Sequence, residues 1–159
     1  MRARVCLVAV ALLGLAGCGG GSGDGATPPG DRGQAMLANL PSCDRVPMGE
    51  GTGAGAEVTG LVLPDGARVT SAVPQGALTT VEATVRMTPL DVRAHYQGRT
   101  DVEVLNVEDE IFESEVLLRA GQHRMYLRAT ALCADGTALT AVVGPDSDDA
   151  GLPEFRSGG

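Results

Sequence analysis

Carboxylate side chains gather in the middle of the chain, where they could bind a cation or transfer protons. Residues 108–110 are three consecutive acids, and Glu103, Glu113 and Glu115 lie nearby. Carboxylates coordinate Ca²⁺ and, in pairs, serve as general acid and base. The run lacks the spaced Asp/Asn and Gly pattern of a calcium loop, and adjacent residues of a strand point to opposite faces. We therefore expect a solvated turn here and no metal site.

The histidines, His95 and His123, are the next candidates for proton transfer. Each is isolated in the sequence, and the chain contains no nucleophile elbow, zinc-binding helix motif, phosphate loop or dinucleotide fingerprint. We expect no catalytic residues and no cofactor. One alternative stays open, namely an enzyme that assembles dispersed carboxylates with His95 or His123.

An apolar run near the N-terminus ends on a single thiol, Cys18. Arg2 and Arg4 supply a positive start, residues 5–15 are nearly all apolar, and small residues lead up to the cysteine. This order is that of a secretory signal. The apolar run is shorter than the roughly 20 residues that span a bilayer, so we do not expect a transmembrane helix here.

The motif Leu15-Ala16-Gly17-Cys18 resembles the lipobox of bacterial lipoproteins. The resemblance implies that residues 1–17 are a signal peptide removed by a dedicated peptidase, and that the thiol of Cys18 carries a diacylglycerol. It also implies a protein anchored to the cell membrane or cell envelope, on its extracytoplasmic face. The likeness covers about the first twenty residues and carries no information about the domain that follows.

Two further thiols, Cys43 and Cys133, remain after Cys6 leaves with the signal peptide and Cys18 is lipidated. In an oxidising, extracytoplasmic compartment two leftover cysteines typically form a disulfide. Two free thiols or a metal site are the alternatives. Because no Cys-x-x-Cys motif or neighbouring histidine favours a metal site, we expect the disulfide.

The mature chain is strongly acidic. All twelve basic residues are arginine, against twenty acidic residues, for a net charge of −8. Removal of Arg2 and Arg4 with the signal peptide leaves ten basic residues and moves the charge to −10. Such a surface repels nucleic acids and anionic headgroups. We therefore expect no nucleic-acid partner.

Composition divides the mature chain into three parts. Residues 18–39 are rich in Gly and Pro and predict a flexible tether, although residues 36–40 could form a helical turn. Residues 40–143 are long enough to bury a core and predict a single domain. Residues 144–159 are again rich in Gly, Pro and Asp and predict a disordered tail.

Alternating apolar and polar residues predict several β-strands in the domain. The predicted strands are residues 58–63, 67–73, 81–87, 102–107, 111–119, 122–132 and 138–143. Pro64-Asp65-Gly66 is expected to form the turn between the first two strands.

One short helix is predicted over residues 89–97, where Thr88 is a suitable N-cap, Pro89 suits the first position and Asp91 adds negative charge. Gly98 is expected to end the helix in the left-handed conformation. Two apolar pairs lie on nearly opposite sides of this helix, so the sequence does not indicate which side is buried. These pairs are Leu90 with Ala94 and Val92 with Tyr96. Together the elements predict an α+β domain, a small, mostly antiparallel sheet with one short helix on one face.

Two hairpins are predicted in the second half of the domain. With Ala120-Gly121 as the first turn, Glu115 faces Tyr126 and Glu113 faces Arg128. Asp135-Gly136 is expected to form the second turn.

The polar face of the first hairpin is the candidate contact surface. It comprises Glu113, Glu115, Arg124, Tyr126 and Arg128. We accordingly expect a lipid-anchored, non-enzymatic envelope lipoprotein with an interaction or structural domain, which contacts the membrane through Cys18 and an envelope protein through this face. A small-ligand carrier with a pocket between helix and sheet is the other alternative.

Overall fold

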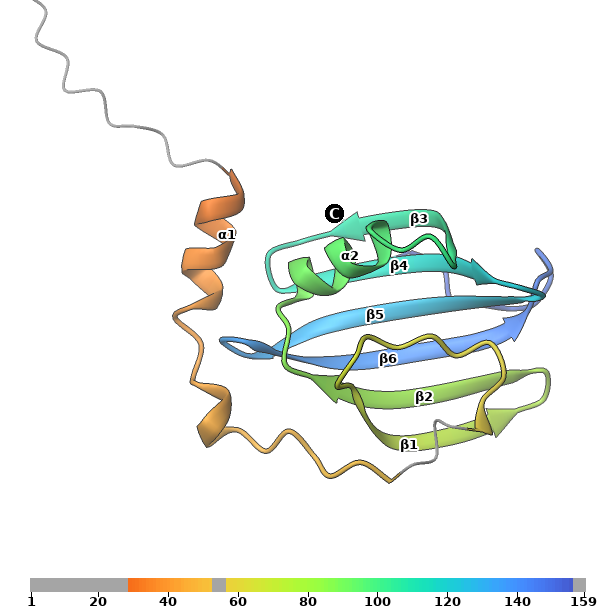
Figure 1. The fold of residues 1–159 in the computed structure, drawn as a ribbon, viewed down its shortest axis with the longest axis horizontal. Helices are drawn as coiled ribbons and strands as arrows, with labels where there is room; N and C mark the ends of the chain where they lie inside the picture. The colour runs from red at the N-terminus through yellow and green to blue at the C-terminus, as the bar shows by residue number, and fades with distance from the viewer. Residues whose placement is uncertain (1–28, 53–56, 156–159) are drawn as a thin grey trace, which may run out of the picture.

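The computed structural model describes residues 29–52 and 57–155 (Figure 1). Six strands form one sheet in the order β1-β2-β6-β5-β4-β3, and every neighbouring pair is antiparallel. The strands are β1 (Arg68–Gln75), β2 (Leu78–Val85), β3 (Glu103–Asp109), β4 (Glu113–Ala120), β5 (His123–Cys133) and β6 (Gly136–Pro145). The predicted α+β class, with a mostly antiparallel sheet, is confirmed.

The order of the strands explains why helix α2 (Pro89–Gln97) lies across one face of the sheet. β2 and β3 are consecutive in the chain, but β6, β5 and β4 lie between them in the sheet. The connection must therefore cross one face of the sheet, and α2, which contacts β3, β4 and β5, forms part of that crossing (Figure 1).

The start of α2 is as predicted. The Thr88 hydroxyl accepts a hydrogen bond from the Asp91 amide, and the Asp91 carboxylate accepts one from the Thr88 amide, which makes a capping box. Val92 and Tyr96 are fully buried, so they form the core-facing side that the sequence left open. The prediction for Gly98 was wrong, because this residue ends the helix in the right-handed region, at φ −86°.

Residues 58–63 are not a strand, contrary to the prediction. They cross the same face of the sheet as α2 without strand pairing (Figure 1). Their apolar side chains pack against the core. A nine-residue helix is about 14 Å long, whereas six strands span about 24 Å. This segment therefore covers sheet that α2 leaves bare, and the Tyr96 hydroxyl holds it by donating to the Val62 carbonyl oxygen at 2.7 Å.

The turn between β4 and β5 is Gly121-Gln122, not Ala120-Gly121. Ala120 pairs with His123, and Glu115 pairs with Arg128 where Tyr126 was predicted. Gly121 adopts φ +61°, as the first position of a type II′ turn requires. The register therefore differs from the prediction by two residues, a shift that keeps every side chain on its predicted face.

The turn between β5 and β6 is likewise displaced by one residue. Ala134-Asp135 form it, and Gly136 already pairs with Cys133 as the first residue of β6. A Cβ atom at Gly136 would lie 2.6 Å from the Cys43 sulfur and 2.7 Å from the Cys133 sulfur. Gly136 thus makes room for the disulfide instead of supplying a turn conformation.

The Cys43–Cys133 disulfide is present, with its Cα atoms 5.1 Å apart. Cys43 begins the short 3₁₀ helix η1 (Cys43–Arg45), and Cys133 ends β5. Both cysteines are buried, and beside them the Ala134 amide donates to the Pro41 carbonyl oxygen at 3.0 Å. The bridge therefore attaches the segment before the sheet to the β5–β6 hairpin.

The expected tether is partly helical. Helix α1 (Pro29–Leu37) lies in its second half, and the Leu37 side chain is only 1% exposed. A Cβ atom at Gly33 would lie 3.6 Å from Leu90, so α1 approaches the start of α2. The structure therefore differs from a tether without secondary structure at residues 29–37, where the Leu37 side chain is buried.

The C-terminal boundary also differs. β6 continues to Pro145, two residues past the predicted end of the domain. The chain then makes further contacts with the sheet through residues 146–155, which we call the C-terminal strap. The structure therefore differs from a tail without contacts, because residues 144 and 145 belong to β6 and acids of the strap pair with arginines of β4 and β5.

Candidate functional site

The sheet has two unlike faces. Alternate residues of β4 and β5, such as Val116, Leu118, Met125 and Leu127, join the core under α2. The intervening residues point to the opposite face, which we call the outer face. All five residues of the predicted contact surface, Glu113, Glu115, Arg124, Tyr126 and Arg128, lie on this outer face.

Two of these five residues are buried, although the sequence suggested an exposed surface. Glu115 is 3% exposed and Tyr126 is 4% exposed. The Tyr126 hydroxyl donates a hydrogen bond of 2.5 Å to the Glu115 carboxylate. Desolvation, with a smaller contribution from Glu115, raises the pKa of Tyr126. The phenol therefore stays protonated and remains a hydrogen-bond donor at neutral pH.

Next to this pair, Arg128 and Glu113 form an ion pair across the hairpin. The Arg128 Nε atom donates to Glu113 Oε2 at 2.7 Å, and the Thr130 hydroxyl donates to the same oxygen at 3.2 Å. The predicted partnership of Glu113 with Arg128 is thus present as a diagonal contact, since the residue directly opposite Glu113 is Thr130. A basic, partly exposed side chain therefore borders the buried pair.

The strap covers the other end of the outer face. Asp146 forms ion pairs with Arg124 (2.6 Å) and Arg119 (2.8 Å), and Asp148 pairs with Arg124 (2.7 Å). Farther along, the ring of Phe155 meets the ring of Tyr126 edge to face at 5.8 Å. The outer face is therefore not a bare surface, because a peptide segment of the same chain lies on it.

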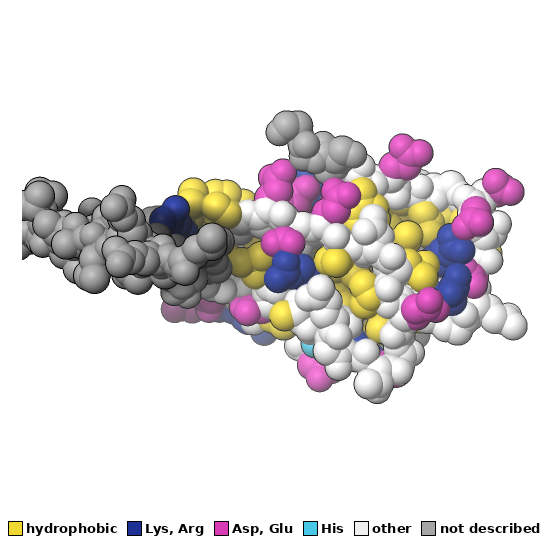
Figure 2. All heavy atoms as spheres, turned by 90° about the horizontal axis from the view of Figure 1, so that it is seen from above, with side chains coloured by type: hydrophobic (Ala, Val, Ile, Leu, Met, Phe, Trp, Pro, Cys, Tyr) yellow, Lys and Arg dark blue, Asp and Glu magenta, His cyan; other side chains and the backbone are white. Residues whose placement is uncertain are grey.

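Sequence reasoning missed Arg119, Asp146, Asp148 and Phe155 as members of this site. It assigned the two aspartates to a disordered tail. The available signal was that these acids come directly after β6, which lies beside the arginine-bearing strand β5. Figure 2, which views the molecule onto its β3 edge, shows basic side chains in contact with acidic ones. Glu103 of β3 belongs to this arrangement through its 2.6 Å ion pair with Arg119.

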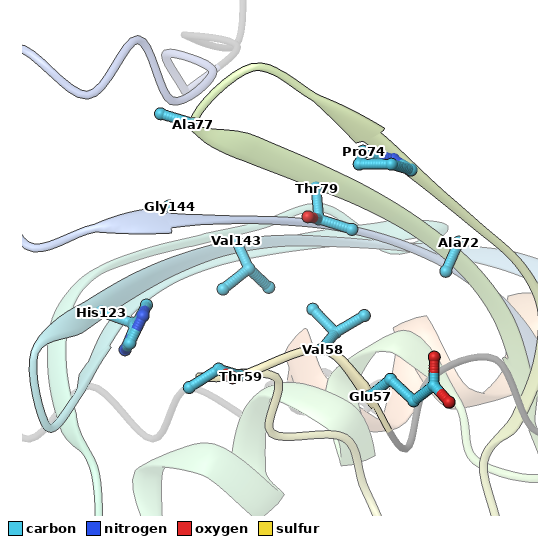
Figure 3. A pocket seen from close by; sticks show the side chains of 10 residues that line it. All are labelled: Glu57, Val58, Thr59, Ala72, Pro74, Ala77, Thr79, His123, Val143 and Gly144. Carbon is cyan, nitrogen blue, oxygen red and sulfur yellow. The ribbon is translucent and has the colours of Figure 1, made fainter.

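A second candidate site is a cavity of about 480 Å³ on the core side of the sheet (Figure 3). Residues 57–59 form one wall, and β1, β2, β5, β6 and Ala77 of the β1–β2 turn contribute the rest. The side chains of Val58, Val143 and His123 surround the hollow, whereas the Glu57 carboxylate lies at its far end (Figure 3). The carrier alternative expected its pocket between the helix and the sheet. The cavity lies elsewhere, and the α2 side chains Val92 and Tyr96 are fully buried against the core.

The remaining candidates lie apart from one another. His95 contacts Arg99 (3.3 Å) and the Tyr96 ring, whereas His123 lines the cavity. In the acidic run, Asp109 pairs with Arg93 at 2.5 Å. Within residues 29–52 and 57–155, no three His, Cys, Asp or Glu side chains are grouped so that they could hold a metal ion.

Cys18, the predicted lipidation site, lies outside the described residues. In the described part of the chain, no helix has the length and apolar character needed to cross a bilayer. Comparisons with protein-family models, with curated proteins and with solved structures give no match for this chain.

Proposed function

We propose that the chain is a lipid-anchored lipoprotein of the cell envelope and that its domain binds an envelope protein through the outer face. A diacylglycerol on Cys18 holds the domain at the extracytoplasmic side of the membrane. In this proposal the domain binds and does not catalyse a reaction.

One observation carries the assignment of the binding surface. The outer face already holds a peptide segment, the strap, through charged and aromatic side chains. A surface that holds charged and aromatic side chains from a segment of its own chain has the chemistry to bind a segment of another protein. The Cys43–Cys133 disulfide supports the compartment, because structural disulfides persist in oxidising surroundings.

The anchor is tested with the Cys18→Ala variant, expressed in its host and fractionated. We expect the variant to keep its signal peptide and to lack the fatty acid that mass spectrometry finds on wild type. Cys6→Ala is the matched control, since it removes a thiol from the same segment and leaves the motif intact. A Cys18→Ala chain that is processed and membrane-bound like wild type contradicts the anchor.

The binding surface is tested by affinity capture from membranes with wild type and Arg128→Glu. Arg45→Glu makes the same change of charge on an exposed arginine of η1, which is not one of the five residues of the contact surface. We expect a captured protein that is lost with Arg128→Glu and kept with Arg45→Glu. Equal capture by both variants places the contact elsewhere on the molecule.

The cavity beside His123 supports a second candidate function, carriage of a small ligand. Its volume of about 480 Å³ lies in the range of ligand pockets, and its lining mixes valines with threonine and histidine. Thr79, whose side chain points into the hollow (Figure 3), offers the test. Anilinonaphthalene sulfonate should fluoresce with wild type and not with Thr79→Tyr. Equal fluorescence from both proteins removes the carrier.

A further inference from the structure

The outer face contains an apolar strip that the strap contacts. Leu117, Tyr126 and Val142 pair directly across β4, β5 and β6, so their side chains form one row on this face. Tyr126 and Val142 are 4% and 8% exposed, although α2 and residues 58–63 lie on the other side of the sheet. Phe155 contacts the ring of Tyr126, and Leu152 approaches the neighbouring Gly144. The strap therefore contributes to a second layer over the strip.

The strap is held by side chains more than by its backbone. Among the described residues, the strap backbone makes a hydrogen bond to the β4–β5 turn, where the Asp146 amide donates to the Gln122 carbonyl oxygen. The amide of Ala150 donates to Ser147 within the strap itself. Partly exposed ion pairs and an aromatic contact contribute little free energy each, so the strap can exchange with a competing segment.

The charges define what such a competitor must carry. Arg119 and Arg124 lie side by side at the turn end of β4 and β5, and the strap places Asp146 and Asp148 on them. Nine residues after Asp146, the strap places an aromatic ring on the strip. Arginine guanidinium groups select carboxylates, and the Tyr126 ring selects an aromatic edge.

We propose that the outer face recognises an acidic segment with an aromatic residue on a partner protein, and that the C-terminal strap is an internal competitor for the same site. The inference rests on the proposed function, which it deepens by naming the chemistry of the partner. A tethered competitor acts at an effective concentration on the order of millimolar. The apparent affinity for the partner is therefore the intrinsic affinity multiplied by the fraction of molecules in which the strap has left the face.

The test uses a fluorescein-labelled peptide with the sequence of residues 145–155 and the purified, oxidised mature protein. The strap is weakened by the combined substitutions Asp146→Asn, Asp148→Asn and Phe155→Ala. We expect this variant to bind the peptide at least tenfold more tightly than wild type. Asp149→Asn, which removes one charge from the same segment, should bind like wild type. A peptide in which both pairing aspartates are asparagine should bind the weakened variant at least tenfold less well.

Equal peptide affinity of wild type and the weakened variant, or no binding to the weakened variant, overturns the inference. Circular dichroism of each protein checks that the sheet is intact, and Arg124→Ala in the weakened variant should abolish binding without loss of the sheet. Dimerisation of the weakened variant at micromolar concentration also overturns the inference, because the occupant is then a second copy of the chain. A separate result contradicts the proposed function, namely affinity capture from membranes that is equal for Arg128→Glu and Arg45→Glu.

Discussion

The Tyr126 hydroxyl reaches the Glu115 carboxylate along a diagonal of the β4–β5 hairpin, because the residue opposite Tyr126 is Leu117 and the residue opposite Glu115 is Arg128. This diagonal contact places a buried carboxylate beside a buried phenol at the centre of the outer face. It explains how an acidic side chain is accommodated there, since a buried charge requires a hydrogen-bond donor.

Removal of that donor should destabilise the domain. Tyr126→Phe keeps the ring on Phe155 and removes the hydroxyl from a buried carboxylate, a change that typically costs about 1–3 kcal/mol. Urea unfolding of the oxidised protein measures this free energy. In a double-mutant cycle with Glu115→Gln, we expect the two substitutions to be non-additive. Additive effects contradict a direct interaction between the two residues.

Both tyrosines of the chain should resist ionisation. Desolvation is the largest cause that raises the pKa of Tyr96 and of Tyr126 above the ordinary value of 10.0. Their contribution to stability is therefore complete below pH 10 and is lost as the pH rises above it. Absorbance at 295 nm should show little tyrosinate in the folded chain between pH 10 and 11. The unfolded chain in urea should titrate near pH 10, and a folded chain that does the same refutes the assignment.

Acid should detach the strap before it unfolds the sheet. The hydrogen bond from Arg124 is the largest cause that holds the pKa of Asp146 below its ordinary value of 3.8, and Arg119 acts in the same direction. A carboxylate with a lowered pKa stabilises the folded state above its unfolded pKa and loses this effect as the pH falls. The strap contacts should therefore weaken as the pH falls below 3.8.

The NMR signals of the Phe155 ring report this detachment, because the Tyr126 ring lies edge to face with it. At pH 5 the Asp146→Asn variant should show the Phe155 signals that wild type shows in acid, whereas Asp149→Asn should resemble wild type. Phe155 signals that do not change between pH 5 and pH 2.5 contradict a role for the carboxylate.

A side chain at Gly136 should disrupt the junction of disulfide and hairpin. The Cβ of Gly136→Ala would lie within 2.7 Å of both sulfurs, so one of the buried elements has to move. We expect a loss of about 1–3 kcal/mol, as in other overpacked sites, measured by urea unfolding. Gly98→Ala is the matched control, since its Cβ meets nothing closer than 3.5 Å and its φ is negative. Similar stability of the two variants contradicts the tight fit.

The sequence by itself determined the features that depend on neighbouring residues. Thr88, Pro89 and Asp91 specify the start of α2 through a cap that closes within four residues. The two-residue period of β4 and β5 specifies which side chains share a face, and it did so correctly for Glu113, Glu115 and Tyr126. The pairing of Cys43 with Cys133 was predictable once Cys6 had been assigned to a predicted signal peptide and Cys18 to a predicted lipidation site.

Only the tertiary structure decided the features that depend on distant contacts. A register shift of two residues leaves the pattern of faces unchanged, so periodicity could not distinguish Gly121-Gln122 from Ala120-Gly121 as the turn. The width of the sheet required residues 58–63 as cover instead of a strand. Asp146 and Asp148 of the strap pair with arginines more than twenty positions earlier in the chain, and no local pattern records a contact over that separation.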